Sequence, residues 1–244
     1  PMLRPQGCDR AKVAKAVNYT VNANWKLVWE NNRECYHCNI SHPQYIKANY
    51  DHYNTDDTSS ELMAKIADKS ERSEKTWGRQ GLAITHRSSG MAPFPDAGNE
   101  GWFTINRTPL ADGYVSETMN GQQVAPLMGD YTDNSVGTLR LRTVPNMWCH
   151  ASCDHVVSTR LLPIDKSTTE VRVIWLVDEK AEEGKDYDLE KVMPFWQLTS
   201  EQDWTLCEAA QLGVQSSGYQ PGPYSTHKEY NVERFVRWYL NQLK

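Results

Sequence analysis

Six short segments between residues 102 and 177 resemble β-strands, and they constrain the possible fold more than any other feature of the sequence. They are rich in β-branched and aromatic residues, and turn signals such as Asn120-Gly121 separate them. Because the segments follow one another in quick succession, an antiparallel meander is the most economical arrangement. The segments are 102–106, 114–119, 138–144, 147–150, 156–162 and 170–177.

Helical patterns flank these segments on both sides. A short strand pattern at 18–22 precedes a helical pattern over 25–38, which Pro43 ends before His42 because proline disfavours helix at the preceding residue. The other expected helices lie at 58–75, which opens with a capping box, at 189–212, with a break at Pro194 and a stop at Gly213, and at 232–243. Together these patterns predict one α+β domain spanning residues 1–244.

Charge and composition exclude several classes of protein. Lys and Arg total 26 against 31 Asp and Glu, which disfavours a nucleic-acid partner, and no apolar run approaches the roughly 20 residues of a membrane helix. Six cysteines are too few for a disulfide scaffold, and no signal segment opens the chain. We therefore expect a reduced, cytoplasmic protein and, since the sequence starts at Pro1, a piece of a longer chain.

The densest group of potential metal ligands lies between Glu34 and His42, and it allows three interpretations. Two histidines could bind a metal that prefers imidazole and carboxylate. Alternatively, four cysteines could form a structural zinc site: Cys35, Cys38, Cys149 and Cys153. These residues could also simply be packed in the core.

Helical spacing gives the histidine interpretation a geometry. Glu34 and His37 are three residues apart, so the carboxylate can hydrogen-bond the imidazole nitrogen that faces away from a metal. His42 lies beyond the expected helix end and can turn back toward His37. A distant acid would complete the two-histidine, one-carboxylate triad of non-haem Fe(II) oxygenases.

These residues resemble the iron-binding segment of Rieske-type non-haem iron oxygenases. The matching text is Asn24-Trp25-Lys26, Glu30-Asn31, Glu34-Cys35-Tyr36-His37 and His42-Pro43, with a second match over 202–211. The resemblance implies a helix-grip (START-like) fold, an antiparallel sheet around a long C-terminal helix. It also implies iron ligands His37, His42 and Asp203, and a Glu34 that bridges to the Rieske cluster of a neighbouring subunit in a homotrimer.

The sequence around Glu34 is most similar to the branch of this family that demethylates quaternary ammonium compounds. The resemblance implies that Fe(II) and O2 convert stachydrine (proline betaine) to N-methylproline and formaldehyde, with glycine betaine or carnitine as alternative substrates. Electrons would come from NAD(P)H through a flavin and iron-sulfur reductase and a Rieske [2Fe-2S] cluster. The cluster requires C-x-H and C-x-x-H motifs, and the second is absent from the sequence, so we expect the cluster domain in a missing N-terminal part.

A quaternary ammonium ion has no hydrogen to donate, so aromatic rings are its expected binding surface. The candidates are Trp102, Phe103, Trp148, Trp175 and Trp204. Asn31 is a candidate pocket residue because it lies close to the ligands in sequence. Two functions of other classes remain open, a structural zinc-binding module and a ligand-binding module without catalysis.

Overall fold

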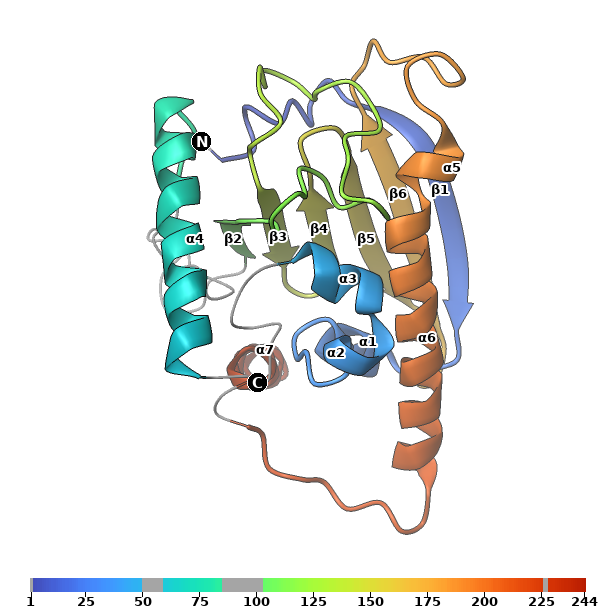
Figure 1. Ribbon diagram of the computed structural model, residues 1–244. Helices are drawn as coiled ribbons and strands as arrows, with labels where there is room; N and C mark the ends of the chain where they lie inside the picture. The colour runs from blue at the N-terminus through green and yellow to red at the C-terminus, as the bar shows by residue number, and fades with distance from the viewer. Residues whose placement is uncertain (1, 50–58, 85–102, 226–227) are drawn as a thin grey trace.

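A computed structural model describes residues 2–49, 59–84, 103–225 and 228–244. Its centre is a six-stranded antiparallel sheet with the strand order β1-β6-β5-β4-β3-β2 (Figure 1). The strands are β1 (Lys12–Val21), β2 (Phe103–Thr108), β3 (Thr138–Thr143), β4 (Met147–Ala151), β5 (Val156–Pro163) and β6 (Thr169–Val177). The predicted meander is thus confirmed from β2 to β6, and β1 pairs with the last strand.

Helices cover one face of this sheet. The helices of the described residues are α1 (Trp25–Asn31), α2 (Cys38–Ser41), α3 (Pro43–Ala48), α4 (Ser60–Arg79), α5 (Leu189–Val192), α6 (Pro194–Gln215) and α7 (Tyr230–Gln242). Figure 1 shows α1, α3 and the long α6 in front of the sheet, while α4 stands beside the β2 edge. None of the described helices is long and apolar enough to cross a bilayer.

Alternation along the strands decides which side chains meet the helices. On β6, Val171, Val173 and Trp175 are completely buried and belong to the same apolar cluster as Trp29 of α1 and Phe195 of α6. The opposite face of the sheet carries a smaller cluster that includes Leu139 and Cys149. The sheet therefore grips α6 on one face, which confirms the expected α+β helix-grip fold.

Two predicted elements differ from the structure. Residues 114–119 do not form a strand, because buried side chains bind this segment in place of a neighbouring strand: the Glu117 N–H donates to Ser152 Oγ. The predicted helix over 25–38 ends at Asn31, and Glu34 instead accepts the Tyr36 N–H at 2.5 Å, a local contact that competes with helix formation.

The remaining helix boundaries agree with proline and glycine chemistry only in part. Pro194 does divide the predicted helix over 189–212, since α5 ends at Val192 and α6 starts at Pro194. Gly213 does not stop α6, which continues to Gln215. The capping box Thr58-Ser59-Ser60-Glu61 predicts the cap one residue too early, because the N-cap of α4 is Ser59, whose Oγ accepts the Leu62 N–H.

Candidate metal centre

The segment between α1 and α3 places two histidines side by side. His37 is the N-cap residue of α2. His42 is the C-cap residue of α2 and also the N-cap residue of α3, which starts at Pro43. The two imidazole rings meet edge to face, with centroids 4.9 Å apart and planes at 87°. This short helix–turn arrangement brings residues five apart in sequence to one point.

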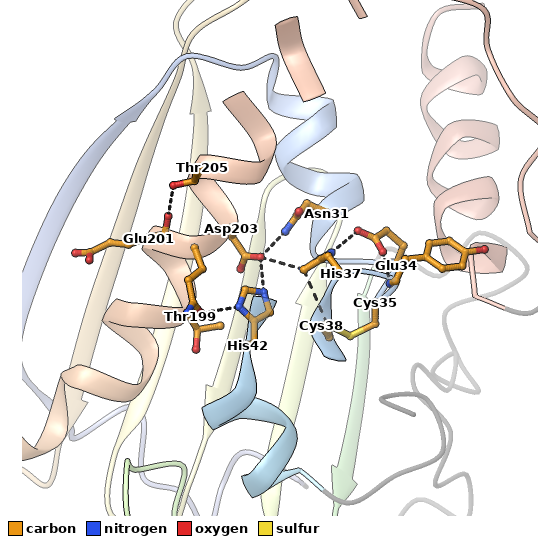
Figure 2. A network of polar contacts seen from close by, with 12 residues as sticks. Asn31, Glu34, Cys35, His37, Cys38, His42, Thr199, Glu201, Asp203 and Thr205 are labelled. Carbon is orange, nitrogen blue, oxygen red and sulfur yellow. Dashed lines mark hydrogen bonds and ion pairs between the residues drawn. A yellow bond between two sulfur atoms is a disulfide. The ribbon is translucent and has the colours of Figure 1, made fainter. Parts of the chain in front are cut away.

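Asp203 reaches the same point from the middle of α6. Its Oδ1 lies 3.1 Å from His37 Nε2 and 2.9 Å from His42 Nε2. Figure 2 shows both rings and the amide of Asn31 directed at this carboxylate, and Asn31 Nδ2 donates to the same oxygen at 2.7 Å. The structure thus brings together the three residues that the sequence predicts as iron ligands, together with Asn31.

The far nitrogen of each histidine is held by an acceptor. His37 Nδ1 lies 2.7 Å from Glu34 Oε1, and His42 Nδ1 lies 2.8 Å from Gln202 Oε1. Because a carboxylate or amide oxygen can only accept, each Nδ1 carries the proton, and in the neutral ring the Nε2 lone pair faces Asp203. This is the tautomer that a metal ligand needs.

The site fits a bound metal ion. Two lone pairs and a carboxylate directed at one another repel unless a proton or a cation lies between them. Ligand atoms at right angles, each about 2.1 Å from a metal, lie about 3.0 Å apart, close to the 2.9 and 3.1 Å found here. Two imidazoles and one carboxylate suit Fe(II) with positions left open.

Without a metal, His37 shares a proton with Asp203. Burial lowers the pKa of His37, but hydrogen bonds to Asp203 and Glu34 outweigh burial and raise the pKa to about 9. Burial acts in the opposite direction on Asp203, where the hydrogen bonds from His37 and His42 prevail and lower the pKa. In the metal-free state the site therefore favours a proton between His37 and Asp203.

A second layer of hydrogen bonds fixes α3 and α6 relative to each other. Gln44 Nε2 donates to Gln202 Oε1 and to Thr199 Oγ1, both at 2.9 Å, and the Thr199 hydroxyl donates to the Phe195 carbonyl. Gln202 thereby holds His42 and Gln44 at once. The sequence alone gave no signal for this role of Gln202 beyond its position immediately before Asp203.

A cavity opens beside the three converging side chains. Residues of α6, of the segment from Asn31 to Tyr45, and of β3 and β4 line it. Glu34, Asn31, Tyr45 and Trp196 are among them, and so are Arg140, Arg142 and His150 from the sheet. Three of these positions follow from helix spacing, since Tyr45 is three residues after His42, and Trp196 and Thr199 precede Asp203 by seven and four.

Of the five aromatic residues predicted to bind the substrate cation, the four that the structure describes do not line this cavity. Trp175 is fully buried in the core, Trp148 packs against Trp29 with centroids 6.2 Å apart, and Trp204 packs against Tyr19 at 6.1 Å. Phe103 lies on the edge strand β2, away from the cavity, and Trp102 is outside the described residues. Among the described residues, Tyr45 and Trp196 contribute the tyrosine and tryptophan rings of the cavity wall.

The cysteines do not form the alternative zinc site. Cys35 and Cys38 are joined in a disulfide, so the expectation that all six cysteines are reduced is wrong for this pair. Cys149 faces the opposite side of the sheet, and Cys153 lies in a third apolar cluster with Trp77. Four thiolates therefore do not converge in this fold.

An antiparallel sheet that grips a long helix, with two histidines and a carboxylate converging beside a cavity, defines a candidate mononuclear metal domain. A family model described as the ring hydroxylating alpha subunit (catalytic domain) matches residues 8–244. The chain therefore belongs to the ring-hydroxylating oxygenase alpha-subunit family.

Two relatives are more specific in name. The chain is 38% identical over 247 residues to the glycine betaine monooxygenase oxygenase subunit of Chromohalobacter salexigens, covering 99% of this chain and 52% of that protein. It is 36% identical over 242 residues to the subunit of the same name from Pseudomonas aeruginosa, covering 99% and 54%. The chain spans about half the length of the curated relatives it matches.

Solved structures confirm the fold. A quaternary ammonium Rieske monooxygenase studied for carnitine oxidation has a TM-score of 0.58 and 16% identity, covering 96% of this chain and 51% of that one. The quaternary ammonium Rieske monooxygenase CntA in complex with L-carnitine has a TM-score of 0.54, also at 16% identity, covering 97% and 51%.

Proposed function

We propose that this chain is the iron-binding catalytic domain of a monooxygenase that removes an N-methyl group from a quaternary ammonium compound. The observation that carries the proposal is the convergence of His37 Nε2 and His42 Nε2 on Asp203 Oδ1 beside a cavity, in a chain of the ring-hydroxylating family. These three residues would hold Fe(II), with Glu34 and Gln202 keeping each histidine in the ligating tautomer.

A bound Fe(II) would activate dioxygen beside the substrate. In the overall step one methyl C–H becomes C–OH, the second oxygen atom leaves as water, and two electrons and two protons balance the reaction. The hydroxymethyl group then leaves as formaldehyde, its hydroxyl proton is released to solvent, and the nitrogen keeps the electron pair of the broken C–N bond. The residues that line the cavity would hold the methyl group at the open side of the triad.

Tyr45 and Trp196 would hold the cation. Their rings meet edge to face at 5.9 Å, and Tyr45 also contacts His42 with centroids 6.5 Å apart. Aromatic faces attract a quaternary ammonium ion by about 0.5–2 kcal/mol per ring. Because these rings lie next to a proposed ligand, an N-methyl group bound to them would lie near the metal.

Glycine betaine is the first substrate to test, because both curated relatives described above carry its name. Carnitine follows from the solved relatives, and stachydrine, the substrate expected from the sequence, completes the panel. All three combine a quaternary ammonium with a carboxylate.

The electrons are proposed to come from outside residues 1–244. A Rieske [2Fe-2S] cluster in a preceding domain would be reduced by NAD(P)H through a flavin and iron-sulfur reductase. A homotrimer would place the cluster of one subunit against Glu34 of the next. Glu34 suits this role because its carboxylate contacts His37 and is 17% exposed.

The test is metal content and formaldehyde release. Anaerobically prepared wild-type protein should contain about one iron per chain, and His37→Ala and Asp203→Ala should lose it. Iron-loaded protein supplied with hydrogen peroxide, which delivers both oxygen and the two electrons, should release formaldehyde from glycine betaine. Zinc that survives both substitutions and disappears with Cys35→Ser would identify a structural zinc module. A protein that binds betaine equally well without metal would be a ligand-binding module.

A further inference from the structure

A disulfide lies directly beside the candidate metal centre. Cys35 and Cys38 flank His37 in the sequence, and both line the same cavity as the converging side chains. Figure 2 shows the bond next to the His37 ring. The two cysteines are only 6% and 5% exposed, but Tyr36 between them is 48% exposed. The bond therefore belongs to a surface segment that a small thiol can approach.

The sulfur of Cys38 lies near the metal-facing side of His37. Cys38 Sγ is 3.9 Å from His37 Nε2, the nitrogen that is directed at Asp203. The potential ligand atoms of His37, Cys38 and His42 all lie within 4.8 Å of one another. A sulfur about 2.3 Å and an imidazole nitrogen about 2.1 Å from one ion lie about 3.1 Å apart at right angles and about 4.4 Å apart on opposite sides. The Cys38 sulfur is therefore close enough to share an ion with His37.

The state of the disulfide determines what this sulfur can do. A thiolate is a metal ligand, whereas a sulfur bonded to a second sulfur carries no charge and is a poor one. While the bond is closed, Cys38 Sγ is also held in place by Cys35. Reduction removes this constraint and lets the Cys38 side chain rotate toward the ion. Opening the bond therefore turns an inert side chain into a fourth candidate ligand.

We propose that Cys38 is a redox-controlled ligand of the metal centre. With the disulfide closed, His37, His42 and Asp203 alone hold the ion, and once the bond is reduced the Cys38 sulfur joins them. This inference rests on the metal centre of the proposed function and adds a means of regulating it. The sulfur would occupy one of the positions that the triad leaves open for dioxygen and substrate.

Both directions of the switch balance in atoms and electrons. A dithiol reductant opens the bond by exchange: it donates two electrons and two protons, becomes a disulfide itself and leaves two cysteine thiols. The thiol proton of Cys38 passes to solvent when the sulfur binds the ion. Hydrogen peroxide closes the bond by removing two electrons and two protons from the thiols, while its O–O bond breaks and two water molecules form.

The experiment identifies the ligand atoms with Co(II) as the probe, because cobalt follows iron in the divalent series and binds the same ligand types. Wild-type protein is divided into an untreated sample and a sample treated with a dithiol, which is removed before equimolar Co(II) is added without oxygen. X-ray absorption at the cobalt edge should show only nitrogen and oxygen ligands in the untreated sample. The reduced sample should gain one sulfur at about 2.3 Å.

Two variants separate the sulfur from the cross-link. Cys35→Ser leaves the Cys38 thiol free at all times and should show the sulfur ligand without reduction. Cys38→Ser also lacks the disulfide but should show no sulfur in either sample. The melting temperature of each variant shows whether it is folded.

Cys207→Ala is the matched control, because Cys207 lies on α6 one turn after Asp203 and is also buried. It should gain sulfur on reduction exactly as the wild type does. A sulfur signal that is absent from reduced Cys207→Ala would assign the ligand to Cys207 and overturn the role of Cys38.

Cobalt without a sulfur ligand in both reduced wild type and Cys35→Ser would also overturn the inference. If His37→Ala lost cobalt in that case, the metal centre of the proposed function would stand without the switch. A wild-type protein that bound no cobalt in either state would overturn both.

Discussion

Two clusters of this molecule combine histidine with a carboxylate at similar distances, yet their surroundings differ. In the open cluster, His37 and His42 approach Asp203 Oδ1 at 3.1 and 2.9 Å beside a cavity. In the closed cluster, His155 Nδ1 lies 2.8 Å from Asp154 Oδ1, with side chains only 1% and 0% exposed. A short histidine–carboxylate contact therefore does not by itself define a metal site.

The closed cluster saturates its carboxylate with donors from the protein. Ser116 Oγ donates to Asp154 Oδ1 at 2.6 Å and the Val124 N–H donates to Oδ2 at 2.7 Å. The cluster thus attaches the segment around residues 116–124 to the turn between β4 and β5. The open cluster instead directs two Nε2 atoms at one oxygen, where the cavity gives access. Convergence and access, more than residue type, distinguish a binding site from a structural cross-link.

The largest effect on folding is expected in the closed cluster. Asp154→Ala leaves Ser116, the Val124 N–H and His155 without their acceptor, so urea denaturation should show a loss of about 3–5 kcal/mol. The iron affinity of the folded fraction should change less than about twofold. Asp154→Asn keeps one acceptor oxygen and should lose less, which gives a folded variant if the alanine variant does not fold. If Asp154→Ala lost iron while its free energy of unfolding stayed unchanged, the distinction between the two clusters would be wrong.

Substitution of Glu34 tests whether the open cluster binds iron. Glu34→Leu removes the acceptor that holds His37 Nδ1, and we expect anaerobic iron titration to show a 10–100-fold weaker affinity with little change in melting temperature. Glu34→Gln retains an acceptor oxygen and should lose less. Glu61→Gln on the exposed surface of α4 is the control and should bind iron like the wild type. Equal affinities in Glu34→Leu and wild type would contradict the role of Glu34.

A smaller effect on stability is expected from Glu30, a carboxyl group that no histidine contacts in the described part of the chain. Burial, then the charges of Glu229 and Glu34, outweigh Lys26 and raise the pKa of Glu30 to about 7, whereas the pKa values of Asp203 and Asp154 are lowered. Between pH 4.5 and 7 the folded state then binds more protons than the unfolded state, so Glu30 reduces stability as pH rises.

Glu30→Gln should therefore raise the free energy of unfolding of metal-free protein by on the order of 1 kcal/mol at pH 8 and leave it unchanged near pH 4.5. Urea denaturation at both pH values measures the difference. A stabilisation of the same size at both pH values would assign it to packing and not to charge.

The sequence predicted which residues converge in the open cluster better than it predicted the cavity walls. His37 and His42 lie in a short motif, and Asp203 lies in a second one, so the local sequence was sufficient to select these three residues. The cavity walls depend on which face of a strand or helix points inward, and the helix over 25–38 was predicted too long because Glu34 forms local bonds. The aromatic candidates were selected by residue type alone. Trp148, Trp175 and Trp204 are buried and pack in the core.

The strands were predictable where side chains alternate toward two apolar layers, as on β6. Residues 114–119 also alternate, but Ser116 and Glu117 are buried polar residues with partners on distant segments. Such partners cannot be identified from the segment alone. Burial of Arg140 could not be predicted for the same reason, because its partner Asn49 is 91 positions away in the sequence.

The pairing of β1 with β6 also determines the order in which this chain can acquire its structure. Lys12 pairs with Val177, so the first strand has no sheet to join until the ribosome has produced the last strand of the meander. Asp203 follows later still, and only its arrival completes the convergence of His37 and His42. Contacts so distant in sequence slow folding. The chain therefore cannot acquire the complete triad until α6 has been synthesised and has docked.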